Sequence, residues 1–206
     1  MVVKNIMIAK SKLTMVKISD TVEQALCLIN SKNLLSLPVV EGDKFVGIIS
    51  KKYIFEEYFN VSQSKEALLQ RPVSEFMKTT IESVNKDDIL EIAIQLIANK
   101  NRQFIPVVDD KDEFVGILTH NAIFGTFTNI LGFGHTRMII STHDVKGRVA
   151  KLAEIISKQD GNIISIVQID VNVMNLRQFL VRVDIENPKK LADKLEENGF
   201  RIRRID

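Results

Sequence analysis

Two stretches of the chain, DTVEQALCLINSKNLLSLPVV at residues 20–40 and DILEIAIQLIANKNRQFIPVV at residues 88–108, are versions of one sequence. They are identical at ten of 21 positions, including the Pro-Val-Val at the end of each. The match continues downstream, where FVGIISKKYIF at 45–55 resembles FVGILTHNAIF at 114–124. It also continues upstream, where VKNIM at 3–7 resembles VSEFM at 73–77. Agreement over three separate blocks indicates an internal duplication within the first two thirds of the chain.

Each copy shows the same order of predicted elements. Apolar residues at helical spacing predict an amphipathic helix, and Asp20 and Asp88 are the expected N-caps. The apolar positions are Val22, Leu26 and Ile29 in the first copy and Leu90, Ile94 and Ile97 in the second. A hairpin of two short strands follows at 37–40 and 45–49, and then a second helix at 51–59, matched at 121–131. The repeating unit is therefore predicted to be β-α-β-β-α.

A helix, an apolar-Pro-Val-Val strand, a turn and a Gly-apolar-apolar-Ser/Thr strand before another helix resemble the CBS domain. Both copies carry the whole pattern in order, over residues 1–60 and 72–131, so together they resemble a CBS pair. The resemblance implies that the two units pack through their sheets and that their clefts bind adenine nucleotides.

The remaining third of the chain has a different pattern. Glycines near residues 132–136 predict a linker, and residues 137–206 form a second domain. Its predicted strands are 137–142, 162–173, 178–185 and 200–205, with a turn at 174–177. Its predicted helices run from 148 to 159, capped by Gly161, and from Pro188 to Gly199. This order, βαββαβ, predicts a ferredoxin-like fold and makes the whole protein α+β.

The stretch D-x-x-G-x-V-x-x-L-x-x-I-I-x-x-x-x-x-N-I, from Asp144 to Ile163, resembles the ACT domain. That resemblance implies a small-ligand loop, usually for amino acids, consisting here of Asp144, Val145, Lys146, Gly147 and Arg148. The alternative is that Asp144 and Gly147 only shape the turn and begin the helix. A CBS pair followed by one ACT domain is similar to AcuB-type proteins and to CBS-ACT proteins that bind cyclic di-AMP.

The CBS resemblance places the nucleotide against the entry strand, the residues before Pro-Val, and the start of the helix after the glycine strand. In the first copy these residues are Leu13, Thr14, Met15, Val16, Leu35, Ser36, Leu37, Pro38, Ser50, Lys51 and Tyr53. In the second copy they are Thr79, Thr80, Ile81, Arg102, Phe104, Ile105, Pro106, Thr119 and His120. For Leu37 and Ile105 the alternative of plain core packing is favoured, whereas Arg102 is a candidate phosphate or base contact.

Both copies depart from the family pattern at one position. CBS motifs that bind AMP or ATP have an Asp three residues after the Ser/Thr, and it holds the 2′,3′-hydroxyls of the ribose. Here Tyr53 and Ala122 stand at that position. A cyclic 3′,5′-dinucleotide has no vicinal diol, so cyclic di-AMP is expected ahead of AMP or ATP. Basic residues flank the predicted site and favour an anionic ligand, unless they are merely solvated: Lys10, Lys12, Lys51, Lys52, Lys78, Arg102 and His120.

Composition excludes several other classes. The chain is 45% hydrophobic and 26% charged, which argues against disorder. Its 28 basic and 26 acidic residues nearly balance, which argues against nucleic acid or membrane partners. The single Cys27, predicted to lie in a helix core, and the lack of a signal peptide pattern indicate a cytoplasmic protein without a membrane segment. No catalytic or metal-binding motif is present, so neither enzyme activity nor a cofactor is expected.

The predicted function is therefore that of a non-catalytic, homodimeric sensor of an adenine nucleotide, with an unknown protein target. An amino-acid-sensing ACT dimer that uses the CBS pair as a scaffold is the alternative.

Overall fold

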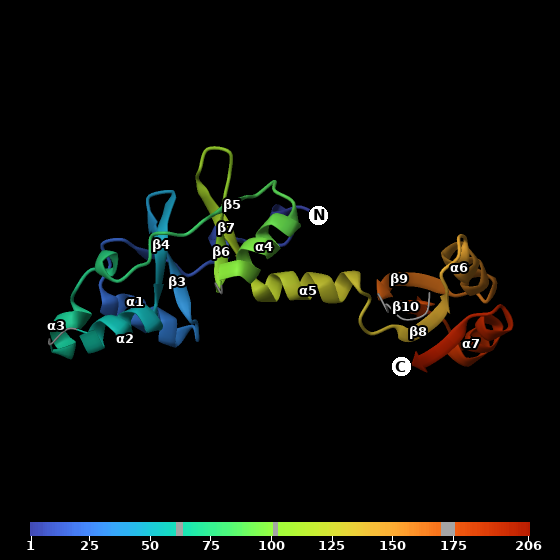
Figure 1. Ribbon diagram of the computed structural model, residues 1–206. Helices are drawn as coiled ribbons and strands as arrows, with labels where there is room; N and C mark the ends of the chain where they lie inside the picture. Colours follow the sequence, from blue (N-terminus) through green and yellow to red (C-terminus); the bar gives the residue numbers. More distant parts are fainter. Residues whose placement is uncertain (61–63, 101–102, 170–175) are drawn as a thin grey trace. The chain divides into compact units, whose positions relative to one another are not determined.

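The computed structural model describes residues 1–60, 64–100, 103–169 and 176–206, without the side chains of residues 99 and 100. The chain divides into two compact units, Met1–Phe124 and Gly125–Asp206 (Figure 1). The division falls inside helix α5 (His120–Ile130). The N-terminal unit contains the two copies of the repeat, and the C-terminal unit contains the remaining third of the sequence.

The two copies have the predicted β-α-β-β-α order. The first consists of β2 (Val16–Lys17), α1 (Val22–Ser31), β3 (Ser36–Glu41), β4 (Lys44–Ser50) and α2 (Lys51–Asn60). The second consists of β5 (Val84–Asn85), α4 (Leu90–Lys100), β6 (Phe104–Val108), β7 (Phe114–Thr119) and α5. In each, the entry strand is parallel to the Pro-Val-Val strand, which pairs antiparallel with the glycine strand. The prediction for this region is confirmed.

Short elements precede and join the copies. They are the 3-10 helices Val3–Asn5, Lys10–Lys12 and Val73–Glu75, strand β1 (Ile8–Ala9) and helix α3 (Lys65–Leu69).

The start of α1 differs from the prediction. Thr21, not Asp20, is the N-cap: its hydroxyl accepts from the Gln24 N–H, and the Gln24 side chain accepts from the Thr21 N–H. This capping box satisfies two amide donors at once. Asp20 instead accepts from the Lys17 N–H (2.7 Å) and closes the preceding turn. In the second copy, Asp88 makes the equivalent bond to the Asn85 N–H.

The prediction for Cys27 is also wrong, because its side chain is exposed. The buried positions of α1 are Val22, Ala25 and Ile29. Cys27 is two residues beyond Ala25, and a two-residue step on a helix turns a side chain to the opposite face.

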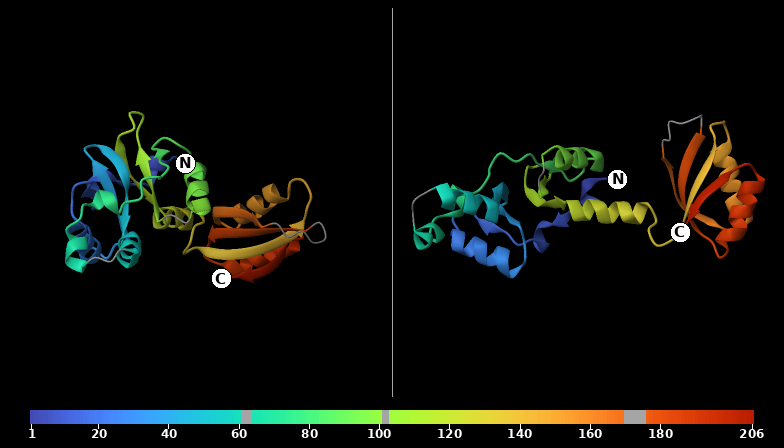
Figure 2. Two further views of the ribbon diagram at one scale, coloured as in Figure 1. Left: turned by 60° about the vertical axis from the view of Figure 1, so that its left-hand side comes forward. Right: turned by 60° about the horizontal axis from the view of Figure 1, so that its bottom comes forward.

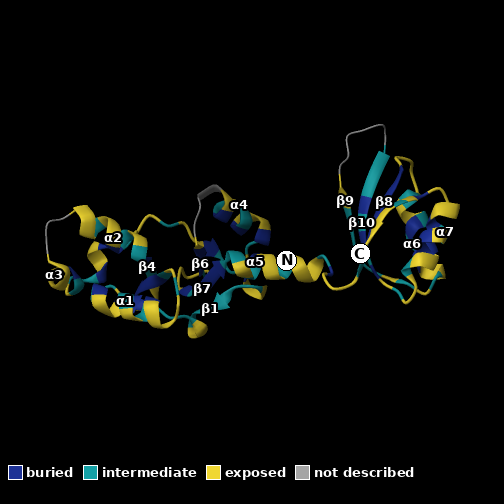
Figure 3. Cartoon of the chain, turned by 90° about the horizontal axis from the view of Figure 1, so that it is seen from below, coloured by how far each residue is buried: buried dark blue, intermediate teal, exposed yellow. Residues whose placement is uncertain are grey.

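Each copy is completed by the segment that precedes the other copy. Strand β1 pairs antiparallel with β7 of the second copy, with Ala9 opposite Gly116, and the two lie side by side (Figure 3). Val3 lies in the core of the second copy. In the other direction, Lys78 exchanges backbone hydrogen bonds with Ile48 of β4, and Val73 and Phe76 lie in the core of the first copy.

The two copies pack against each other through a shared apolar cluster. Its buried members are Val40, Ile48, Phe104, Phe114 and Ile117. The rings of Phe45 and Phe114 lie 5.4 Å apart, and the Phe114 N–H donates to the Asp43 carbonyl (2.8 Å). Lys4 and Asp87 tie the start of the chain to the second copy, and this hydrogen bond lowers the pKa of the Asp87 carboxyl below its usual value. The repeat therefore forms one folded body.

The C-terminal unit has the predicted βαββαβ order. Its elements are β8 (Thr136–His143), α6 (Arg148–Lys158), β9 (Asn162–Ile169), β10 (Leu176–Asp184), α7 (Pro188–Glu197) and β11 (Arg201–Ile205). The sheet order is β11-β8-β10-β9, and every neighbouring pair is antiparallel. Helices α6 and α7 cover one face of this sheet (Figure 2) and share a core with β8 and β10.

Two local predictions for this unit need correction, and one lies partly outside the described residues. Leu176 and Arg177, predicted in a turn, begin β10. The left-handed residue after α6 is Asp160 (φ 57°), one before the predicted Gly161. Residues 170–175, predicted to end a strand and begin the turn, are outside the described part of the chain.

The segment predicted as a linker packs against β9 and β10. The Ser165 hydroxyl donates to the Leu131 carbonyl (2.8 Å), and the Arg182 guanidinium lies over the Phe133 ring. Gly132 has φ +71°, a conformation that favours glycine, and a Cβ there would collide with Ile164.

Among the helices of the described residues, none combines the length and apolar character needed to cross a membrane.

Candidate nucleotide site

The hydroxyls predicted to bind the nucleotide lie where a strand passes directly into a helix. Ser50 ends β4 and accepts from the Tyr53 N–H (3.3 Å) at the start of α2. Thr119 ends β7 and accepts from the Ala122 N–H (3.2 Å) at the start of α5. The two copies therefore build the same structure, in which the hydroxyl begins a helix and the third following residue occupies its first turn.

Strand register brings part of each predicted set together. Ser36 lies opposite Ser50, and Phe104 lies opposite Thr119. Because β2 runs parallel to β3 with Val16 opposite Val39, the residues just before β2 lie toward the beginning of β3. The predicted entry segment and the residues before Pro-Val are thus neighbours in the fold.

Burial separates the predicted residues into two groups. Leu37 and Ile105 are at most 1% exposed and lie in the cores of their copies, as the packing alternative predicts. Others in this group are buried as well: Val16, Pro38, Phe104 and Pro106. Ser50 is also buried. The remaining described members are exposed or half-buried: Leu13, Thr14, Met15, Leu35, Ser36, Lys51, Tyr53, Thr79, Thr80, Ile81, Thr119 and His120. A ligand in solution can contact these exposed or half-buried residues.

Some of the basic residues near this site are already paired. The Lys10 ammonium lies 2.8 Å from an Asp43 carboxylate oxygen, and Lys52 lies 3.6 Å from Glu56 on the same helix. Lys51 and His120 are half-buried at the starts of α2 and α5. Arg102, a predicted phosphate contact, lies outside the described residues. The positive charge open to a ligand is therefore smaller than the sequence suggests.

In the C-terminal unit, the predicted small-ligand loop borders a cavity of about 180 Å³. The Asp144 carboxylate is paired with the Arg177 guanidinium (2.6 Å), and Gly147, with φ +85°, is the N-cap of α6. The ion pair of Asp144 and the position of Gly147 at the helix start are what the alternative predicts, in which these two residues shape the turn and begin the helix.

Arg148, the last residue of that loop, is held by the fold. Its guanidinium donates to the Thr142 hydroxyl (2.7 Å) and to the carbonyls of Asn198 and Gly199, and it lies 3.8 Å over the Phe200 ring. These contacts join the start of α6 to the turn between α7 and β11. The sequence pattern does not indicate this connection.

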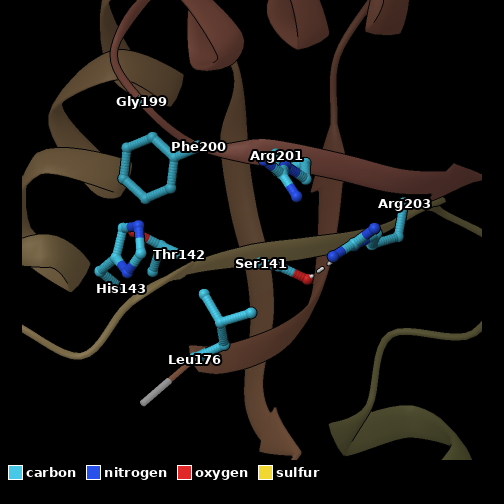
Figure 4. A pocket seen from close by; sticks show the side chains of 8 residues that line it. All are labelled: Ser141, Thr142, His143, Leu176, Gly199, Phe200, Arg201 and Arg203. Atoms are coloured by element: carbon cyan, nitrogen blue, oxygen red, sulfur yellow. Dashed lines mark hydrogen bonds between the residues drawn. The ribbon is translucent and has the colours of Figure 1, made fainter. Parts of the chain in front are cut away.

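A second, larger cavity in this unit was not predicted from the sequence. Its volume is about 300 Å³, and it is lined by Ser141, Thr142, His143, Leu176, Gly199, Phe200, Arg201 and Arg203 (Figure 4). The alternation of Arg and Ile in 201–205 is the signal that could have pointed to it, although the same pattern is typical of an ordinary solvated strand face.

Comparison with known proteins identifies the N-terminal unit. Residues 3–60 and 73–127 match the CBS domain. The CBS domain-containing protein YhcV of Bacillus subtilis is 32% identical over 100 residues, which cover 48% of this chain and 68% of that protein. The chain spans about a third or less of the length of the first curated relatives it matches. This chain belongs to the CBS-domain family, and its two copies form a tandem CBS pair.

Solved structures of other proteins match about three fifths of this chain in fold. CBSX2 in complex with AMP is 27% identical, with a TM-score of 0.54, and the match covers 62% of this chain and 96% of that one. The CbpB protein of Listeria monocytogenes in complex with c-di-AMP is 23% identical, with a TM-score of 0.55, and the match covers 61% of this chain and 94% of that one. CBS-pair structures of this fold therefore include complexes with a mononucleotide and with a cyclic dinucleotide.

Proposed function

We propose that this protein is a non-catalytic regulatory sensor whose CBS pair binds an adenine nucleotide, with cyclic di-AMP preferred over AMP and ATP. One observation carries the preference. In both copies the strand-end hydroxyl is followed, in the first turn of the helix, by a residue without a carboxylate, Tyr53 or Ala122. The CBS-pair neighbours that bind AMP or c-di-AMP support the ligand class.

The energetic reason for the preference is the ribose. A carboxylate that accepts hydrogen bonds from two vicinal hydroxyls contributes about 1.5–3 kcal/mol, which is about ten- to a hundredfold in affinity. A mononucleotide loses this contribution here. A cyclic 3′,5′-dinucleotide has its 3′-oxygen in a phosphodiester and therefore loses no such contribution. Tyr53 and Ala122, in place of Asp, thus favour the cyclic dinucleotide over a mononucleotide.

Restoring the carboxylate provides a direct test. Ala122→Asp is expected to raise affinity for AMP about ten- to a hundredfold and to leave affinity for cyclic di-AMP unchanged or lower. An acidic residue is favourable in the first turn of a helix, but Ala122 is half-buried against the core of the second copy, so a thermal melt of the variant checks that it folds. Isothermal titration calorimetry with AMP and 2′-deoxy-AMP measures the effect, and 2′-deoxy-AMP should gain little.

Ala122→Asn is the matched control, because the Asn side chain has nearly the same shape as that of Asp but no charge. The affinity for AMP should therefore rise less in Ala122→Asn than in Ala122→Asp. An equal gain for AMP and cyclic di-AMP in Ala122→Asp would contradict the proposed role of the missing carboxylate.

We further propose that the CBS pair associates with a second copy through α2 and the start of α5, up to Phe124. Phe55 of α2 and Phe124 of α5 occupy equivalent positions in the two copies and both belong to the N-terminal unit, and their side chains are 52% and 62% exposed. Exposed apolar residues repeated at equivalent positions favour a symmetric partner, and a second copy of the chain is such a partner.

The double variant Phe55→Lys/Phe124→Lys is expected to be monomeric. Light scattering during size-exclusion chromatography should then give 23.4 kDa, against twice that mass for the unchanged chain. Val145→Lys changes an equally exposed apolar residue of the C-terminal unit and should leave the dimer intact. A monomeric unchanged chain would contradict this proposal.

The C-terminal unit is proposed to be an ACT domain, which would make the protein AcuB-like. Its βαββαβ order agrees with that assignment. Its role here is to transmit the ligand-bound state of the CBS pair to a protein target, since a ligand shifts a conformational equilibrium only through different affinities for its states. The cavity beside Asp144 keeps amino-acid sensing as a second candidate, and a thermal-shift panel of free amino acids tests it.

A further inference from the structure

The larger cavity of the C-terminal unit lies at one end of its sheet. It is formed by the end of β8, the start of β10, and the Gly199–Phe200 turn that leads into β11. In Figure 4, Arg203 extends from β11 toward Ser141, while Arg201 projects from the same strand closer to Phe200. At about 300 Å³, the cavity is at the small end of the range of ligand pockets.

The charge of this cavity is one-sided. Arg201, Arg203 and His143 line it, and no acidic residue does so among the residues that the structure describes. Within the described residues, neither arginine forms an ion pair. Two nearby arginines, Arg137 and Arg204, do form ion pairs, because both contact the carboxylate of Asp206. The register of β11 against β8 shifts between Ile202 and Arg204, so strand alternation alone does not set the direction of Arg203. Both Arg201 and Arg203 nevertheless line the same cavity, and their like charges repel each other there.

The polar groups beside these arginines suit an anion. The Arg203 Nε–H donates to the Ser141 hydroxyl (3.2 Å), which is 6% exposed and holds the guanidinium against β8. A guanidinium fixed in this way keeps its remaining N–H groups for an oxyanion, and arginine forms paired hydrogen bonds with carboxylate or phosphate. The cavity also has an apolar part, formed by Leu176 and the Phe200 ring.

We propose that this cavity binds a small organic anion whose carboxylate or phosphate head lies between Arg201 and Arg203 and whose apolar body lies against Leu176. The anion relieves the repulsion between the two arginines, and burial of its apolar part adds to the affinity. This site lies entirely within the C-terminal unit and does not depend on nucleotide binding by the CBS pair.

The test uses the full chain, labelled with ¹⁵N, and four probes of similar or reduced size. Hexanoate and hexyl phosphate carry the two anionic heads, hexanol lacks the charge, and inorganic phosphate lacks the apolar body. Amide shifts are expected at 141–143, 176 and 199–203 with hexanoate or hexyl phosphate, and the tighter of the two identifies the head. Hexanol and inorganic phosphate should each bind at least about tenfold more weakly.

Variants separate this site from general attraction of anions. Arg201→Gln/Arg203→Gln should weaken binding of the better probe at least about tenfold, since each lost charge-assisted contact contributes on that scale. Both side chains are exposed, and an unchanged melting temperature confirms that the variant folds. Lys189→Gln changes an exposed residue of α7, removes a charge elsewhere in the unit and should not change binding.

Three results would overturn the proposal: no amide shifts with either anionic probe, shifts that persist in the double variant, or inorganic phosphate binding as tightly as the organic anions.

Discussion

Replacing Gly116 with alanine is expected to lower the melting temperature of the N-terminal unit by about 10 °C. A Cβ at this position would collide with the Ile8 carbonyl oxygen and would lie 3.2 Å from its carbon and 3.3 Å from the Ala9 Cα. All three atoms are backbone atoms of β1, so no side chain can move aside. Overpacking of this kind costs about 3 kcal/mol, which corresponds to that temperature shift in a unit of this size.

The equivalent glycine of the first copy gives an internal comparison. A Cβ at Gly47 would lie 2.8 Å from the Lys78 carbonyl oxygen, so Gly47→Ala should also destabilise the unit. At Gly125, inside α5, no atom other than those of its chain neighbours and its own helix backbone lies within 4 Å of the same position. Gly125→Ala should leave stability unchanged or raise it by up to about 1 kcal/mol, through better helix propensity. Circular dichroism melts measure all three, and unchanged melting of Gly116→Ala would contradict the pairing of β1 with β7.

Replacing Arg148 with alanine is expected to destabilise the C-terminal unit by about 3 kcal/mol. The guanidinium donates three hydrogen bonds and lies over the buried Phe200 ring. Hydrogen bonds from a charged group contribute about 1.5–3 kcal/mol each, but water compensates part of the loss at a half-exposed side chain. Arg148→Lys should recover little, because an ammonium cannot reproduce the planar fork that reaches Thr142 and the two carbonyls.

Hydrogen exchange localises that effect. The amides around Gly199 and the start of β11 should lose protection in Arg148→Ala, whereas Lys146→Ala, in the same loop, should exchange as the unchanged chain does. Unaltered exchange and stability in Arg148→Ala would show that this arginine is not a structural residue and would favour a ligand-binding role for the loop.

The repeat made most of the fold predictable. Helical spacing at Val22 and Ile29, the Pro-Val-Val strands and the glycine strands are local signals, and each corresponds to an observed element. The exchange of β1 and Lys78 between copies was not predictable, because it is a long-range pairing of very short segments. Gly47 and Gly116 mark those crossings, but their sequence pattern does not say what approaches them.

The candidate site was predictable in part. The repeat predicted that Ser50 and Thr119 lie at equivalent helix starts, as they do. The CBS resemblance implies that Tyr53 and Ala122 stand where AMP- or ATP-binding motifs have an Asp. Core packing was expected for Leu37 and Ile105 and is observed. The pattern did not separate Val16 or Phe104 from accessible residues in the same way, because their burial depends on segments that pack against them from elsewhere in the chain. The pairing of Lys10 with Asp43 joins segments far apart in the chain, so no local pattern predicts it. The alternation of Arg and Ile in 201–205 indicates one polar strand face, but it does not indicate the β8 and β10 residues that complete the cavity beside Arg201.

Isothermal titration calorimetry of the unchanged chain with cyclic di-AMP, AMP and ATP tests the central claim most directly. The absence of a carboxylate after Ser50 and Thr119 predicts that cyclic di-AMP binds at least about tenfold more tightly than either AMP or ATP. Tighter binding of AMP or ATP than of cyclic di-AMP, or no binding of any of the three, would contradict it.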